Sequence, residues 1–102
     1  MLPKESEILR NLRLVEGLKA DLVTSVAEVY QAMAQNRPQE EVVENLAQTI
    51  IGAYVLGRRL GIDYERLDEI VIGKIGHNIA KNTQAENWFG DLSQLKRHLK
   101  NQ

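Results

Sequence analysis

The chain has 102 residues, of which 43% are hydrophobic, and its formal net charge is −1. This length predicts a single domain spanning residues 1–102, and the apolar fraction is typical of a folded protein. A net charge this close to zero provides no general attraction to nucleic acid. The chain has no cysteine, which excludes disulfide bonds and thiolate chemistry and fits a cytoplasmic protein.

Neither a secretory leader nor a membrane span is expected. Residues 1–10 lack the apolar core of a secretory signal. The uncharged run at residues 46–57, extended by one residue if Asn45 is included, is shorter than the ~20 apolar residues that cross a bilayer. We therefore expect no membrane partner.

The first third of the chain has the apolar period of a helix. Hydrophobic residues recur every three or four positions from Ile8 to Met33. This predicts helix from about residue 4 to residue 35, either continuous or as two helices joined near Gly17. Asn36-Arg37-Pro38 then breaks the pattern, and Pro38 suits the first turn of the next helix.

The second predicted helix runs to about Leu60 and is apolar around most of its circumference, which is typical of a central helix. Gly61 fits the left-handed position after a helix end. Asp63 is suited to cap a third helix, with Ile62 and Leu67 placed for a hydrophobic staple. We expect that third helix to end at Asn82-Thr83.

The last predicted helix begins near Asp91, which with Gln94 resembles a capping box. Trp88 and Phe89, just before it, are expected to pack this helix onto the others. No segment alternates as a strand does, so the expected fold is all-α, a bundle of about four helices.

Five uncharged or acidic polar residues stand out within the first two helices. Helical spacing places Thr24 and Ser25 one turn before Glu28, and Asn45 one turn before Gln48. If the two helices pack antiparallel, these groups could face one another. Two interpretations are open: the groups satisfy one another or lie on an exposed edge, or they line a pocket for a small ligand or ion.

A metal at these positions would have few carboxylate ligands. Magnesium prefers oxygen ligands that include several carboxylates, and Glu28 is the only carboxylate among the five residues. Glu44, one turn from Gln48, is an alternative acid. We therefore expect no cofactor, or Mg²⁺ or Mn²⁺ with Glu28 as ligand if the protein is an enzyme.

Other candidates for chemistry have simpler explanations. His77 and His98 lie near helix ends, where histidine complements the helix dipole. The basic clusters Arg58-Arg59 and 96–100 also lie at helix C-termini, with phosphate or nucleic-acid contact as the alternative.

The order of these elements resembles the MazG-like proteins of the all-α NTP pyrophosphohydrolase superfamily, in particular a short bacterial MazG-like family. The resemblance covers most of the chain, and the segments that support it are "LVTSVAEVYQAM", "YVLGRRLGI", "RLDE" and "ENWFGDLSQLKRHL". In that superfamily the first helix bears Glu-Glu-x-x-Glu and the second Glu-x-x-Asp. The resemblance implies that those carboxylates hold magnesium, which binds a nucleoside triphosphate and activates water.

This sequence departs from both motifs. Thr24-Ser25-x-x-Glu28 falls on the first motif and Asn45-x-x-Gln48 on the second, so one of five carboxylates is kept. The resemblance therefore implies a relic pocket in a catalytically inactive protein that acts by self-association, as a homodimer or tetramer, or by binding a nucleotide-like small ligand. The alternative is a Mg²⁺- or Mn²⁺-dependent nucleotide pyrophosphohydrolase with a nonstandard metal site.

Overall fold

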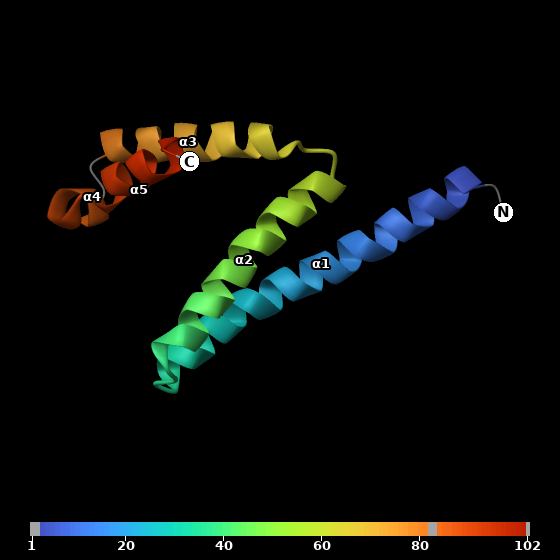
Figure 1. Ribbon diagram of the computed structural model, residues 1–102, viewed down its shortest axis with the longest axis horizontal. Coiled ribbons are helices and arrows are strands. Elements are labelled where there is room, and N and C mark those ends of the chain that lie inside the picture. The colour runs from blue at the N-terminus through green and yellow to red at the C-terminus, as the bar shows by residue number, and fades with distance from the viewer. Residues whose placement is uncertain (1–2, 82–83, 102) are drawn as a thin grey trace. The chain divides into compact units, whose positions relative to one another are not determined.

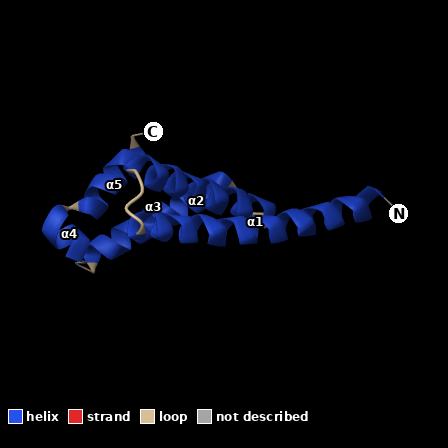
Figure 2. Cartoon of the chain, turned by 90° about the horizontal axis from the view of Figure 1, so that it is seen from below, coloured by secondary structure: helices blue, strands red, loops and turns tan. Residues whose placement is uncertain are grey.

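The computed structural model describes the backbone of residues 3–81 and 84–101, and the side chains of these ranges from Ser6 onward. The described chain is helical and contains no strand (Figure 2). Its helices are α1 (Pro3–Ala34), α2 (Gln39–Arg59), α3 (Tyr64–Ala80), α4 (Gln84–Phe89) and α5 (Asp91–Lys100). The all-α prediction is confirmed, with the short α4 as an additional helix before the last one.

The helices form two compact units, α1 with α2, and α3 with α4 and α5. In the first unit α1 is one continuous helix, and α2 returns beside it in the antiparallel direction (Figure 1). In the second unit α5 packs against α3, and α4 adjoins α5. Ala32 is fully buried in the first unit, and Ile75 is 5% exposed in the second.

Both long helices of the first unit end in the same left-handed turn. Asn36 has φ 52° and Gly61 has φ 91°, which confirms the prediction for Gly61. In each turn the amide of the next residue reaches back to a carbonyl five residues earlier, from Arg37 to Ala32 and from Ile62 to Gly57 (both 2.9 Å). These bonds satisfy helix-end carbonyls and stop each helix at a defined residue.

The start of α2 differs slightly from the prediction. Pro38 precedes the first helical residue, with φ −53° and ψ 143°, and does not lie within the first turn. Glu40 and Glu41 lie in the first turn and Arg58 and Arg59 in the last, so the charges at each end oppose the helix dipole as expected.

The capping box predicted for the last helix is wrong. The residue before α5 is Gly90, with φ 66°, and Asp91 lies inside the helix. The Gln94 amide donates instead to the Phe89 carbonyl (3.2 Å). At the N-terminal end of α5 the hydrogen-bond acceptor is Glu86 of α4. Its carboxylate accepts hydrogen bonds from the Ser93 amide (3.1 Å) and from the Ser93 hydroxyl (2.6 Å).

The aromatic pair does not pack as predicted. Trp88 and Phe89 contact each other edge to face, with ring centroids 6.3 Å apart, but they are 68% and 67% exposed. The expected end of α3 at Asn82-Thr83 lies outside the described residues.

Candidate functional site

The register between α1 and α2 brings the predicted polar positions to the same level of the hairpin. A Cβ atom at Gly52 would lie 3.4 Å from Cδ1 of Leu22, so the two helices approach closely at this point. Nearer the connecting loop, the same antiparallel register places Ser25 of α1 across from about Thr49, and Glu28 across from the turn of α2 that contains Asn45.

Most of the polar side chains at this level bond to their own helix. Ser25 is buried, with 7% of the residue exposed, and its hydroxyl donates a hydrogen bond to the Asp21 carbonyl (2.9 Å). The Asn45 amide donates to the Glu41 carbonyl (2.9 Å), and the Thr49 hydroxyl donates to the Asn45 carbonyl (2.8 Å). Such bonds to the carbonyl four residues earlier satisfy polar groups without a partner on another helix.

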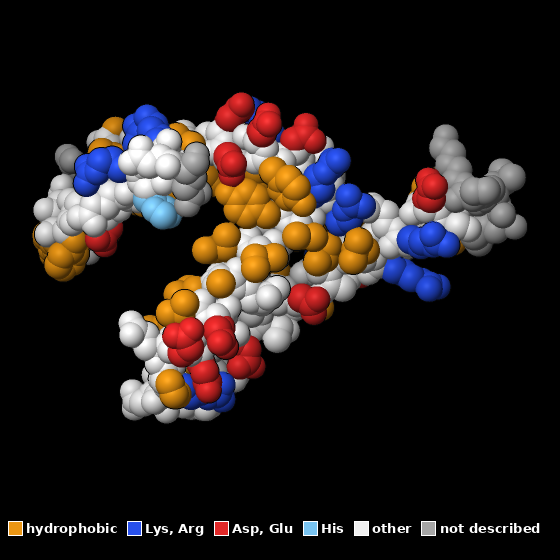
Figure 3. Space-filling view, in the orientation of Figure 1, with side chains coloured by type: hydrophobic (Ala, Val, Ile, Leu, Met, Phe, Trp, Pro, Cys, Tyr) orange, Lys and Arg blue, Asp and Glu red, His pale blue; other side chains and the backbone are white. Residues whose placement is uncertain are grey.

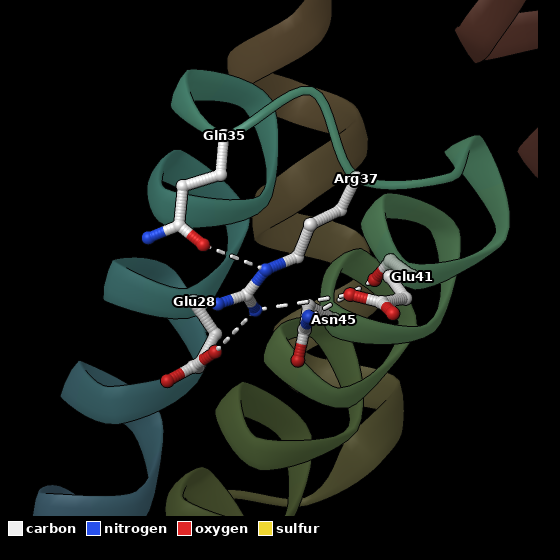
Figure 4. Close-up of polar contacts among 5 residues, drawn as sticks. All are labelled: Glu28, Gln35, Arg37, Glu41 and Asn45. Carbon is white, nitrogen blue, oxygen red and sulfur yellow. Dashed lines mark hydrogen bonds and ion pairs between the residues drawn. The ribbon is translucent and has the colours of Figure 1, made fainter.

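Among the five predicted polar residues, Glu28 is the one that forms an ion pair with the loop leading to α2. Its Oε2 atom lies 3.5 Å from Nη1 of Arg37, and the same nitrogen lies 3.7 Å from Oε2 of Glu41 (Figure 4). Nε of Arg37 donates to Oε1 of Gln35 (3.0 Å). One guanidinium therefore connects an acid of α1, an acid of α2 and the loop between them.

Thr24 and Gln48 are placed differently from the other predicted residues. Both are exposed, whereas Glu28 and Asn45 are half-buried. Glu44, the alternative acid, is exposed as well. The acid of α2 that pairs with Arg37 is Glu41. The site that forms is therefore Glu28, Arg37, Glu41 and the adjacent Asn45 (Figure 4).

The donor chemistry of this site does not fit a divalent metal. Magnesium requires a near-octahedral set of oxygen ligands, usually with one or two carboxylates that are free to bind it. Here the two nearest carboxylates, Glu28 and Glu41, share the positive charge of Arg37. Across residues 6–81 and 84–101, whose side chains the structure describes, no three acidic, histidine or cysteine side chains gather as a metal site would need.

Arg37 was missed as a site residue because the sequence marked it only as part of a helix break. Its spacing from Glu41, four residues, was the available signal, since an arginine and an acid so placed can meet across one helical turn. The contact with Glu28 had no such signal, because it depends on the path of the loop.

The two long antiparallel helices, with Arg37 paired to an acid of each, and the helical C-terminal unit define an all-α protein. A family model, that of the MazG-like family, matches residues 8–92, and the chain belongs to that family. This membership relates the protein to the NTP pyrophosphohydrolase superfamily.

Comparisons with curated proteins and with solved structures found no match. Among the described residues, the helices are too short or too polar for any of them to span a membrane.

Proposed function

We propose that this protein is a catalytically inactive member of the MazG-like family that acts by assembling with further copies of itself. The observation that supports this is the number of large apolar side chains left exposed on α1 and α2. Figure 3 shows hydrophobic side chains along the α2 side of the hairpin. A hairpin of two helices has one shared face, which cannot cover apolar residues on several sides of each helix.

Seven of the exposed residues follow helical stripes, with intervals of three or four positions along each helix. We call these the apolar stripes: Val23, Val26, Tyr30 and Met33 on α1, and Val43, Leu46 and Ile50 on α2. Burial of a large apolar side chain contributes about 1.5–3 kcal/mol, so covering several of them can offset the entropy lost on association.

The residues at the positions of the superfamily's motif carboxylates support the inactive state. Superfamily members are expected to use several carboxylates, and these positions hold Thr24, Ser25, Glu28, Asn45 and Gln48. Neutral residues do not balance a metal's charge, and Glu28 is paired with Arg37. A protein of this composition would serve in the cytoplasm as a binding or assembly unit.

The assembly is tested by the molar mass in solution. We expect sedimentation at micromolar concentration to give a mass of at least two chains. Val23→Glu and Ile50→Glu, at residues that are 71% and 59% exposed, place a charge on each stripe and should weaken association at least tenfold. Gln31→Glu adds the same charge to an exposed polar position of α1 and is the matched control. A wild-type mass of one chain would contradict the proposal.

The inactive state is tested by pyrophosphate release from a panel of canonical and modified nucleoside triphosphates, with Mg²⁺ and then Mn²⁺. We expect no release above background. Saturable turnover that disappears in Glu28→Ala would show that the altered motif still functions, and would favour the metal-dependent hydrolase.

A nucleotide-like small ligand is the second part of the proposal. Thr24 and Gln48 present exposed polar side chains beside the candidate site, so a ligand could reach them from solvent. Nucleotides that raise the melting temperature of the wild type, and not of a Thr24→Ala/Gln48→Ala variant, would support such binding. Equal shifts in both proteins would contradict it.

A further inference from the structure

We propose that Arg37 is the built-in cation of the candidate site: its guanidinium offsets part of the negative charge of Glu28 and Glu41 and keeps divalent metals from binding there. The inference concerns the site of the proposed inactive protein, but it does not depend on self-association. It accounts for the position of two acids, Glu28 of α1 and Glu41 of α2, around one nitrogen of Arg37.

The first support is the position of the charge. Nη1 of Arg37 lies 3.5 Å from Glu28 and 3.7 Å from Glu41, so a single nitrogen serves one acid on each helix (Figure 4). A cation between two carboxylates is also what a bound metal would provide. Because two cations at one place repel each other, the guanidinium and a divalent ion compete for these acids.

The second support is that the guanidinium is held by its surroundings. Arg37 follows the left-handed Asn36, and its backbone amide is bonded to Ala32 (2.9 Å). Its Nε is bonded to Gln35 (3.0 Å), and its side chain is only 34% exposed. Backbone and side chain are therefore both restrained, and the charge stays between the acids without a bound ligand.

The third support is the neutral composition of the remaining positions. Asn45 uses its amide nitrogen on the Glu41 carbonyl, and Ser25 uses its hydroxyl on the Asp21 carbonyl. Neither adds a negative charge. One guanidinium with two carboxylates leaves a small net negative charge, which is too little to attract a divalent ion strongly.

The test is a titration of the full chain with Mn²⁺, in which binding is measured from the relaxation rate of water protons. Arg37→Gln removes the cation and keeps a polar side chain, and Arg37→Lys keeps the charge. Lys19→Gln is the matched control, because it removes one positive charge from an exposed ion pair with Glu16 on the same hairpin. Circular dichroism establishes that each variant is folded.

We expect Arg37→Gln to bind Mn²⁺ about tenfold more tightly than the wild type, because even one weakly screened unit charge at this distance changes affinity by that order. Arg37→Lys and Lys19→Gln should resemble the wild type, and adding Glu28→Gln to Arg37→Gln should abolish the gain. The proposal is overturned if Arg37→Gln binds Mn²⁺ no more tightly than Lys19→Gln, or if the double variant keeps the gain.

Failure here is distinguishable from failure of the proposed function. The titration measures metal affinity of variants, whereas self-association is measured by mass and the inactive state by turnover of the wild type. A monomeric wild type would leave the titration as informative as before.

Discussion

At the scale of single residues, the polar groups within α1 and α2 are satisfied locally. Ser25, Asn45 and Thr49 each donate to a carbonyl one turn earlier in their own helix. These bonds add to a helix whose backbone is already paired, so their contribution to stability is small. Polar residues can therefore persist inside an apolar segment without a ligand.

Ser25→Ala tests this description. Its removal leaves the Asp21 carbonyl still bonded within the helix backbone, and alanine has the higher helix propensity. We expect the free energy of unfolding to change by less than about 0.5 kcal/mol in chemical denaturation. A loss of more than about 2 kcal/mol would mean that the hydroxyl has a further partner on which the fold depends.

The left-handed position at Gly61 gives the opposite expectation. Gly61→Ala places a Cβ where φ is 91°, and we expect it to lower the free energy of unfolding by about 1–2 kcal/mol. Gly17→Ala is the matched control, because nothing lies within 4 Å of an added Cβ and the position is helical. There we expect a gain of about 0.5–1 kcal/mol. Urea denaturation of both variants measures the difference, and equal effects would contradict the assignment.

At the scale of elements, α4 serves as the N-terminal cap of α5. The Glu86 carboxylate accepts two hydrogen bonds from Ser93, the third residue of α5. A negative group near a helix N-terminus both satisfies an unpaired amide and opposes the positive end of the dipole. This six-residue helix is thus linked by the Glu86 side chain, and by the bond from Gln94 to the Phe89 carbonyl, to the helix that follows it.

Glu86→Ala should lower the free energy of unfolding of the chain by about 1–2 kcal/mol, because the Ser93 amide loses its acceptor. Glu86→Gln keeps an acceptor oxygen without the charge and should lie between the wild type and the alanine variant. Thermal denaturation followed by circular dichroism compares the three proteins. An alanine variant as stable as the wild type would exclude a capping role.

At the scale of the whole molecule, the apolar stripes of α1 and α2 predict that folding and association are coupled. Stability of a protein that folds as an oligomer rises with chain concentration, because association binds folded chains and so shifts the folding equilibrium away from the unfolded state. We expect the melting temperature to rise by a few degrees for each tenfold increase in concentration. A melting temperature that is independent of concentration in the micromolar range would argue against coupling.

The helices themselves could be predicted well from the sequence. The apolar period indicated α1 and α2 to within a few residues, and Gly61 was placed correctly because only a left-handed turn explains a glycine after a helical pattern. The cap of α5 was assigned wrongly to Asp91. The residue that accepts the hydrogen bond from the Ser93 amide is Glu86 of the preceding helix. A capping-box pattern includes only the first residues of the helix it caps, so it could not indicate Glu86.

The amino-acid sequence by itself determined the all-α class and the family, because helical period and helix-end residues are local properties that spacing reveals. The tertiary structure alone decided what surrounds Glu28. That outcome depends on the antiparallel register of α1 and α2, and on the left-handed turn at Asn36 that directs Arg37 between the two acids. Contacts that depend on the path of a loop have no periodic signal, so the Arg37–Glu28 ion pair could be identified only in the folded chain.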